Sequence, residues 1–572
     1  MRRLLQELIL PENDRGCPEM FFRGGRKADG GIILRDGEAL SFDTYFNSFA
    51  YTKYRDLTTV KQVDFAVRVL GAAELRLCVY TGGSSICVAQ TGGNGVLALS
   101  VKLSSLPAAG FLYAEIKALG EAGVLGGGFS AECEPREISV AAAICTFRRE
   151  EFVLCNIEVL RAAKFSFINR VFVVDNGGTL DVQEISDDFV KVIPNKNYGG
   201  SGGFSRGMLE ACDGGFSHVL LMDDDIEFYP EVLERMTVFL SLLDEPHRDS
   251  CFSAAMLFLS EANPYIQWEM GGGWSGRFVE SKKHNVDVRD KRVLLDNLDN
   301  DEVQYGTWWC LCIPTEILYT HGLSLPFFVK LDNAEFGLRV ADSTGVITMN
   351  GAAVFHESFQ KKFSFPPEYY VMRNELVTAA IHGGSAADAV RLFWNCIGKH
   401  ILLYRYDNIP LALRAVRDFF GGVDFFLACD EEKLNDEICG LAPRLCSLSD
   451  IPEWREDMRS RAEYRNSCEV SAGVVLAQLV PTCFLDKEIT AQTLDRVQPA
   501  DCAMRRSVIQ YQADGSMGIV TRHNTWKFVK YGFLAAVYSA RLAFGFGRMC
   551  RQYYERCGEI TSMDFWRRHL GL

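Results

Sequence analysis

Apolar residues alternate with polar or small ones along the first quarter of the chain. Positions 63–69 place an apolar side chain at every second residue, and the segments 96–103 and 111–117 repeat this period of two. Glycine-rich turns separate these segments. Several short strands at this spacing predict an antiparallel β-sandwich. We therefore expect an N-terminal β-sandwich over residues 1–137, and we read no catalytic constellation in it.

The pattern changes to short, nearly continuous apolar runs between residues 138 and 370. These runs alternate with segments of helical periodicity in the order 138–145, 149–164, 171–174, 204–213, 218–222 and 230–243. Buried strands that alternate with helices predict an α/β sheet covered on both faces. Ligands of such sheets bind beyond the carboxyl ends of the strands. The polar residues that directly follow the strands are therefore the candidates for function.

Residues 371–572 read as a mostly helical C-terminal domain. Its last part, 522–572, holds nine lysines and arginines against three acids, with aromatic residues interleaved. Basic helices with aromatic side chains bind anionic membrane surfaces. A solvated helix face that packs on the protein body is the alternative interpretation. We expect a cytoplasmic protein that associates peripherally with the inner face of the plasma membrane.

Composition narrows the classes of function. Hydrophobic residues make up 48% of the chain and charged residues 23%, which indicates a globular protein. The net charge of -14 argues against a nucleic-acid partner, which would need basic surface. The 19 cysteines contain no CxxC pair, so zinc-ribbon spacing is excluded and a reducing compartment is favoured. We read neither a signal peptide nor a run of about 18 uninterrupted apolar residues.

Three consecutive acids supply the strongest chemical signal. Asp223, Asp224 and Asp225 follow the apolar run that ends at Met222. Alternation along a strand points Asp223 and Asp225 to the same side, where two carboxylates can hold a divalent cation. His356 also follows an apolar segment and can complete such a site as a neutral imidazole. An acidic turn that caps the next helix is the simpler interpretation of the triplet alone.

Two further segments suggest a site for a nucleotide. Residues 195–207 contain five glycines, and four of them stand just before a predicted helix, where backbone amides can approach phosphate or sugar oxygens. The segment lacks the lysine of a P-loop, and a tight structural turn is its simpler explanation. Thr146, Arg148 and Asp175 stand at the ends of two strands and are candidates for binding a base and ribose, or for capping those strands.

Acids and tryptophans further along the chain suggest a place for the reaction. Asp332 and Glu335 open a predicted helix, and sugar transfer with inversion needs one carboxylate to take a proton from the acceptor hydroxyl. An acid-rich first helical turn is the ordinary alternative. Trp308 and Trp309 can stack on sugar faces and donate hydrogen bonds, or can pack in the core.

The order of these motifs resembles the galactofuranosyltransferases of the inverting GT-A type, and among them the polymerising enzymes of mycobacterial galactan. The motifs run from Cys145-Thr-Phe-Arg148 and Val174-Asp-Asn-Gly177 through the glycine-rich segment to the three acids, the tryptophan pair, Leu331-Asp-Asn-Ala-Glu335 and His356-Glu-Ser358. The resemblance covers nearly the whole chain. It implies a GT-A, Rossmann-like core between an N-terminal β-sandwich and a helical C-terminal domain.

The resemblance also implies an activity and roles for individual residues. The family transfers galactofuranose from UDP-galactofuranose to a lipid-linked or polysaccharide acceptor in cell-surface glycan synthesis, with Mn²⁺ or Mg²⁺. The resemblance implies that Asp223, Asp225 and His356 are the metal ligands and that Trp308 and Trp309 bind the acceptor. The residues that it implies for binding the donor are Thr146, Arg148, Asp175, Asn197, Gly199, Gly200 and Asp224. The expected partners are a UDP-sugar and a glycan or glycolipid acceptor. The oligomeric state stays open, a homo-oligomer included.

One departure from the family concerns the catalytic base. The family has two acids after a tryptophan, whereas this chain has Leu331-Asp332-Asn333. Asparagine cannot act as a general base near neutral pH. Asp332 is our first candidate and Glu335 the second.

Three alternative functions remain open. The donor can be another nucleotide sugar, such as a rhamnosyl or other hexosyl donor. Asn333 favours a non-catalytic carbohydrate-binding relative, although a metal site argues against pure binding. A nucleotidyltransferase is a weaker alternative, because we see no basic clamp for a triphosphate.

Overall fold

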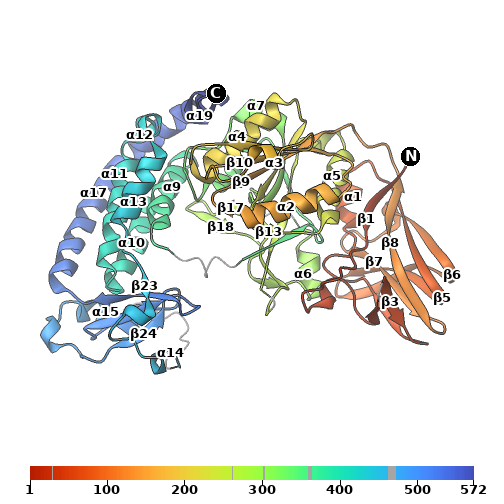
Figure 1. Cartoon of the computed structure of the whole chain (residues 1–572), viewed down its shortest axis with the longest axis horizontal. Coiled ribbons are helices and arrows are strands. Elements are labelled where there is room, and N and C mark those ends of the chain that lie inside the picture. Colours follow the sequence, from red (N-terminus) through yellow and green to blue (C-terminus); the bar gives the residue numbers. More distant parts are fainter. Residues whose placement is uncertain (29, 261, 300–302, 358–363, 461–471) are drawn as a thin grey trace.

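The computed structural model describes residues 1–28, 30–260, 262–299, 303–357, 364–460 and 472–572. Three regions follow one another along the long axis of the molecule (Figure 1). An antiparallel sheet holds the N-terminus, an α/β core lies in the middle, and helices of the C-terminal region stand on the other side.

The N-terminal region is built on one hydrogen-bonded network of eight strands. The 20-residue β5 pairs with β8 through its first half and with β7 through its second half, while β6 pairs along both. The expected alternation is present, because Val63, Phe65, Val67 and Val69 are all buried. A sandwich would place its strands in two separate sheets, whereas here β5 belongs both to the strands around β8 and to those around β7. The elements are β1 (Arg2–Glu7), β2 (Arg26–Ala28), β3 (Gly31–Leu34), β4 (Ala39–Ser41), α1 (Tyr51–Leu57), β5 (Gln62–Thr81), β6 (Ser84–Lys102), β7 (Phe111–Ala118) and β8 (Ala122–Glu132).

The core sheet has seven strands in the order β11-β10-β9-β12-β20-β14-β21. The first four are parallel to one another, and β20 runs antiparallel to β12. Their continuous apolar sequences are explained by burial on both faces. The elements are β9 (Val140–Thr146), α2 (Glu150–Ala162), β10 (Ile168–Asp175), α3 (Val182–Ile185), β11 (Val190–Pro194), α4 (Gly199–Asp213), β12 (His218–Asp223), α5 (Pro230–Ser241), β14 (Cys251–Ser253), β20 (Cys310–Pro314), α7 (Thr315–His321), α8 (Asp332–Val340) and β21 (Val346–Ile347).

A second sheet of five strands, in the order β13-β22-β15-β16-β19, adjoins the end of β12. The two-residue β13 begins directly after the three acids and pairs antiparallel with β22, with Ile226 opposite His356. This register brings residues 130 positions apart to one place. The elements are β13 (Ile226–Glu227), β15 (Ala255–Phe258), β16 (Ile266–Glu269), β17 (Gly272–Trp274), β18 (Val279–Ser281), β19 (Val286–Asp287), α6 (Lys291–Asp296) and β22 (Ala353–His356).

The C-terminal region is mostly helical and also contains a four-stranded sheet, β23-β26-β25-β24, that the sequence pattern did not predict. Helix α9 spans the boundary that we expected at residue 370. The elements are α9 (Pro367–Ile381), α10 (Ala386–Leu402), α11 (Ile409–Phe419), α12 (Gly422–Ala428), α13 (Glu431–Leu441), β23 (Cys446–Ser447), α14 (Asp457–Ser460), α15 (Ala472–Ala477), β24 (Thr490–Thr493), α16 (Pro499–Cys502), β25 (Ser507–Tyr511), β26 (Met517–Arg522), α17 (Thr525–Arg556), α18 (Gly558–Thr561) and α19 (Met563–Leu570).

The last helix returns to the α/β core. The indole N–H of Trp566 in α19 donates to the carbonyl of Ser324 at 2.8 Å, and the hydroxyl of Tyr198 donates to the carbonyl of His569 at 2.9 Å. Trp566 is only 1% exposed. The end of the chain is therefore packed on the glycine-rich segment of the core. Within the described residues, no helix is both long and apolar enough to cross a membrane.

A buried arginine joins the N-terminal region to the core. Arg235 of α5 is 2% exposed and donates to the carbonyls of Phe46 at 3.0 Å, Gly351 at 2.8 Å and Glu7 at 3.1 Å. A side chain at Gly351 would place its Cβ 2.1 Å from the guanidinium. The guanidinium thus bridges three separate segments of backbone.

We expect Arg235→Leu to lower the free energy of unfolding by about 3 kcal/mol, because buried carbonyls lose their donor. Denaturant titration measures this change. Arg248→Leu is the matched control, since its side chain is 49% exposed and its loss should cost less than about 0.5 kcal/mol. Equal effects of the two substitutions would contradict this role for Arg235.

Candidate functional site

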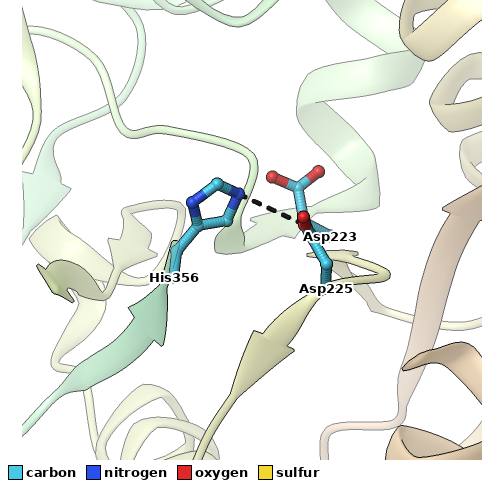
Figure 2. A group of neighbouring side chains, drawn as sticks. All are labelled: Asp223, Asp225 and His356. Carbon is cyan, nitrogen blue, oxygen red and sulfur yellow. Dashed lines mark ion pairs between the residues drawn. The ribbon is translucent and has the colours of Figure 1, made fainter. Parts of the chain in front are cut away.

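Two carboxylates and one imidazole converge where β12 ends. Asp223 is the last residue of β12, Asp225 follows in the turn, and His356 is the last residue of β22. Their ligand atoms all lie within 4.8 Å of one another. Figure 2 shows the three side chains pointing toward one another, with Nε2 of His356 3.2 Å from Oδ1 of Asp225.

This group has the properties of a divalent metal site. Two ligands at right angles around an ion with bonds of about 2.2 Å are about 3 Å apart, which is close to the spacing of Asp225 and His356. Nδ1 of His356 lies 2.6 Å from the carbonyl oxygen of Glu357. Because only a protonated Nδ1 can donate to that carbonyl, this contact leaves Nε2 as the ligand atom. The residues present therefore fit a divalent cation.

The protonation equilibria of the site reflect its crowded negative charge. Burial raises the pKa of Asp223, the Asp225 and Asp224 carboxylates raise it further, and the imidazole of His356 opposes them. Burial works to lower the pKa of His356, but its contact with Asp225 outweighs burial and raises it. A cation bound here would relieve the repulsion among the acids.

Arg149 is a site residue that sequence reasoning missed. Its guanidinium lies 2.7 Å from Asp225 and 3.1 Å from Asp224. We had instead singled out Arg148, whose side chain is exposed and stacks on Phe147 with its guanidinium carbon 5.1 Å from the ring centroid. Arg148 has a left-handed backbone with φ +54°. This local turn decides which of two adjacent arginines faces the acids, and no sequence signal separates them.

The middle acid of the triplet is oriented by its neighbours. The hydroxyl of Thr146 donates to Oδ2 of Asp224 at 2.8 Å, and the side-chain amide of Asn156 donates to its backbone carbonyl at 2.9 Å. Together with Arg149, which also contacts Asp225, these contacts fix the orientation of Asp224. Thr146, which we expected to contact the nucleotide, thus contacts an acid of the site.

The carboxylate of Asp175 is occupied by the chain itself. It accepts hydrogen bonds of 2.8–2.9 Å from four successive backbone amides, those of residues 177–180. Four such bonds use the acceptor capacity of both oxygens. Asp175 therefore shapes the loop after β10, and the structure gives no support to the direct contact with a nucleotide that we expected.

The glycine-rich segment forms the N-terminal turn of α4. Oδ1 of Asn197 accepts from the amide of Gly199 at 3.1 Å. Gly199 has φ +65°, and a Cβ there would lie 2.1 Å from the carbonyl oxygen of Phe328. A side chain is excluded at this position, since it would force apart α4 and the loop before α8. Gly200 lines the cavity beside Asp332.

The two candidate bases occupy different environments. Asp332 lines the cavity, and its Oδ2 accepts from the hydroxyl of Ser201 at 3.3 Å. Burial raises the pKa of Asp332, although backbone hydrogen bonds and Ser201 oppose the shift. A raised pKa strengthens a carboxylate as a proton acceptor.

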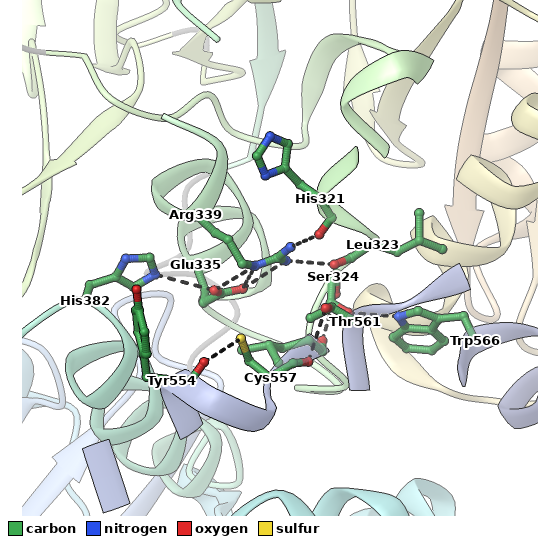
Figure 3. A network of polar contacts seen from close by, with 11 residues as sticks. His321, Leu323, Ser324, Glu335, Arg339, His382, Tyr554, Cys557, Thr561 and Trp566 are labelled. Carbon is green, nitrogen blue, oxygen red and sulfur yellow. Dashed lines mark hydrogen bonds and ion pairs between the residues drawn. The ribbon is translucent and has the colours of Figure 1, made fainter. Parts of the chain in front are cut away.

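Glu335 is not among the residues that line the cavity, and Figure 3 shows it between Arg339 and His382. It is fully buried and pairs with Arg339 at 3.0 Å and with His382 at 3.4 Å. Burial alone would raise the pKa of Glu335, but its contacts with Arg339 and His382 lower it to about 2. A carboxylate so weakly basic and so enclosed is a poor proton acceptor. This geometry disfavours our second candidate base.

The adjacent tryptophans line the same cavity, but their indole N–H groups differ in hydrogen bonding. The indole N–H of Trp309 donates to the carbonyl of Ala254 at 3.0 Å, and the backbone carbonyl of Trp309 accepts from the amide of Asp223. Trp308 packs edge-on against Phe204 and Phe336, and its N–H has no partner among the described residues. Trp308 therefore has a buried N–H donor without a partner among the described residues.

The three acids, His356, Arg149, Asp332 and the two tryptophans line one cavity of about 790 Å³ between the α/β core and the C-terminal region. One side carries the metal-binding group, Arg149 and Asp332, and the other is formed by single faces of α9 and α10. Sequence reasoning saw no chemistry in these helices, because residues spaced three or four apart converge only after the helices pack. The lining residues from the helices are Pro367, Glu368, Val371, Met372, Glu375, Leu392, Asn395, Cys396, Lys399 and His400.

Comparison with known proteins agrees with this geometry. Residues 142–267 match the family model described as glycosyl transferase family 2. The matched segment contains the glycine-rich segment and the three acids, whereas Asp332 and His356 lie beyond it. The chain is a nucleotide-sugar glycosyltransferase with a GT-A core.

The chain is, more narrowly, a relative of the galactofuranosyltransferases. It is 25% identical over 577 residues to galactofuranosyltransferase GlfT2 of Mycolicibacterium smegmatis, covering 92% of this chain and 88% of that protein. It is 27% identical over 443 residues to GlfT2 of Mycobacterium tuberculosis, covering 69% and 67%. Among solved structures, mannosyltransferase PcManGT from Pyrobaculum calidifontis in complex with GDP-Man and Mn2+ is similar at 13% identity, covering 50% and 77%, with a TM-score of 0.29, too low to support an argument.

We expect the native protein to bind one Mn²⁺ and the variants Asp225→Asn and His356→Ala to bind it at least about tenfold more weakly, because each loses a ligand. Titration followed by the paramagnetic resonance of free Mn²⁺ measures this. His321→Ala, on a histidine outside the cavity, serves as the control and should bind like the native protein. Unchanged affinity in both ligand variants would contradict the assignment.

Proposed function

We propose that this protein transfers galactofuranose from UDP-galactofuranose to a glycan or glycolipid acceptor in cell-surface glycan synthesis. The observation that carries the proposal is the similarity to GlfT2 across 92% of the chain, and it is supported by a cavity that is lined by Asp223, Asp225, His356 and the carboxylate of Asp332. The donor, the acceptor and inversion at the sugar are parts of the proposal.

The donor occupies the metal-binding side of the cavity in this proposal. Asp223, Asp225 and His356 hold Mn²⁺ or Mg²⁺, which when bound neutralises the diphosphate of the leaving UDP. Arg149 lies beside the same acids and adds a positive charge for the phosphates. Amides at the start of α4 suit phosphate or sugar oxygens. Arg148 and Asn197 are retained as contacts of the nucleotide.

Asp332 takes the acceptor proton in this proposal. An acceptor hydroxyl attacks the anomeric carbon, its proton passes to a carboxylate oxygen of Asp332, and the bond from the anomeric carbon to UDP breaks. Asn333, the neighbour of Asp332, cannot take that proton. Burial has raised the pKa of Asp332, which suits this role.

The acceptor lies between the tryptophans and the helical wall. Indole rings offer flat apolar surfaces to the C–H faces of sugars. The cavity faces of α9 and α10 combine apolar side chains such as Val371 and Met372 with polar ones such as Glu375 and Lys399. Sugars present both kinds of surface, so this composition supports a glycan as the acceptor.

We expect release of UDP from UDP-galactofuranose to require Mn²⁺ and a galactofuranosyl-terminated acceptor. Asp225→Ala should abolish release, and Asp332→Asn should lower kcat by about 10²- to 10⁴-fold because the base is lost. A coupled assay for UDP measures both.

Glu335→Gln is the matched control for Asp332→Asn, since Glu335 stands on the same helix but outside the cavity. It should retain release at the native rate per folded molecule. Loss in Glu335→Gln with activity kept in Asp332→Asn would transfer the base to Glu335. Release only with another UDP-sugar would refute galactofuranose, and metal-dependent UDP binding without release from any donor would favour a non-catalytic relative.

A second part of the proposal concerns the surface of α17. Its inner face is buried through residues such as Tyr531, Leu542 and Tyr553. Its outer face exposes Trp526 by 85%, Phe533 by 70% and Phe544 by 92%. Basic residues 530, 541, 548 and 551 are exposed on the same helix. Large exposed aromatic side chains among positive charges support binding to an anionic membrane surface at the inner face of the plasma membrane.

We expect the protein to sediment with vesicles containing phosphatidylglycerol and the double variant Phe533→Ser/Phe544→Ser to lose most of this binding. The reason is that two apolar side chains no longer enter the interface. Leu70→Ser, at an exposed leucine of the N-terminal sheet, is the control and should sediment normally. Binding that is unchanged in the double variant would contradict a role for α17.

A further inference from the structure

The loop that carries Asp332 has an unusual backbone. Phe328, Lys330 and Leu331 have φ values of +71°, +69° and +63°. Residues other than glycine adopt this left-handed conformation at a cost of about 1 kcal/mol or more each. Leu331 is also the N-cap residue of α8, so the strain directly precedes Asp332.

Two buried residues of α9 hold this loop. The side-chain amide of Asn374 donates to the carbonyls of Val329 at 3.0 Å and Lys330 at 2.8 Å. The guanidinium of Arg373 donates to the carbonyl of Phe327 at 2.7 Å and also to Oδ1 of Asn374 at 2.9 Å. Asn374 is 0% exposed and Arg373 is 1% exposed, so water does not compete for these bonds.

The glycine-rich segment holds the loop from the opposite side. The amide of Ser201 donates to the carbonyl of Phe328 at 3.1 Å, and the hydroxyl of Ser201 reaches Asp332. Gly199 leaves room for that carbonyl. The strained loop is therefore fastened at both sides, by α4 of the core and by α9 of the C-terminal region.

We propose that Asn374 is a positioning residue that holds the strained 328–331 backbone and thereby places the carboxylate of Asp332 for proton transfer. The inference rests on the proposed role of Asp332 as the base. Asn374 lies outside the residues that line the cavity and acts through the backbone alone. Its loss lets the left-handed residues relax toward ordinary backbone conformations, which moves Asp332 away from the acceptor hydroxyl.

The test compares four proteins: the native chain, Asn374→Ala, Leu331→Gly and the double variant Asn374→Ala/Leu331→Gly. We expect Asn374→Ala to lower kcat for UDP release by up to about 10²-fold, since a shift of about 1 Å at a reacting group has this effect. The KM for the UDP-sugar and the affinity for Mn²⁺ should stay within about twofold of native values.

Leu331→Gly supplies a readout that a general loss of stability would not give. Glycine adopts a positive φ without strain and is tolerated at the start of a helix. With Leu331→Gly as the reference, adding Asn374→Ala should lower kcat at least about tenfold less than Asn374→Ala does in the native chain. Asn297→Ala, at a buried asparagine that bonds Gln267 and Asn350 far from the loop, controls for stability and should leave kcat unchanged.

Amide hydrogen exchange over residues 327–335 tests the inference without turnover. Exchange should accelerate in Asn374→Ala and stay native in Asn297→Ala. The inference is overturned if the loop keeps its protection, if kcat is unchanged, or if KM for the donor rises as much as kcat falls. Should the native protein release UDP only from a sugar other than galactofuranose, the proposed donor fails, and the kcat comparison is made with that sugar.

Discussion

The concentration of negative charge at the end of β12 is the constraint on which the rest of the site depends. Three consecutive carboxylates at the edge of a buried sheet repel one another, and burial makes that repulsion stronger than it would be in water. A small number of positively charged or hydrogen-bond-donating groups around the acids offset this repulsion. Arg149 lies against Asp224 and Asp225, Thr146 donates to Asp224, and His356 approaches Asp225 from a different sheet. What this leaves is a pair of carboxylates with an imidazole, arranged as ligands for a divalent cation.

The reactive half of the cavity depends on contacts between regions that are distant in sequence. Asp332 stands at the start of α8, but the loop before it is held by α4 on one side and α9 on the other. Glu335, one turn further along α8, contacts Arg339 and His382. Two acids three residues apart thus have different environments, because one faces the cavity and the other faces the packed interior. The substitution of the family's second acid by Asn333 leaves Asp332 as the acid available in this turn.

The sequence alone was sufficient for the class of fold and for selecting three residues that the structure brings together as possible metal ligands. Continuous apolar runs require strands buried on both faces, and such strands deliver the residues after them to one edge of a sheet. Asp223, Asp225 and His356 could therefore be selected before any coordinates, and the structure brings them within 4.8 Å. The motifs also follow the same order as in the galactofuranosyltransferases, and this order indicated the class of enzyme. The similarity to GlfT2 across most of the chain supports that class.

Only the tertiary structure determined the directions and hydrogen-bond partners of several side chains in the site. Arg148 and Arg149 are chemically equivalent in sequence, and only a left-handed residue in the turn determines that the second faces the acids. Only the folded loop shows that the carboxylate of Asp175 accepts hydrogen bonds from four amides of its own loop. Asn374 and the cavity faces of α9 and α10 gave no signal, since their function arises when helices from the last third of the chain pack against the core. The physical reason is common to all three: periodicity specifies which face of an element is buried, whereas hydrogen-bond partners and side-chain directions depend on what packs against that face.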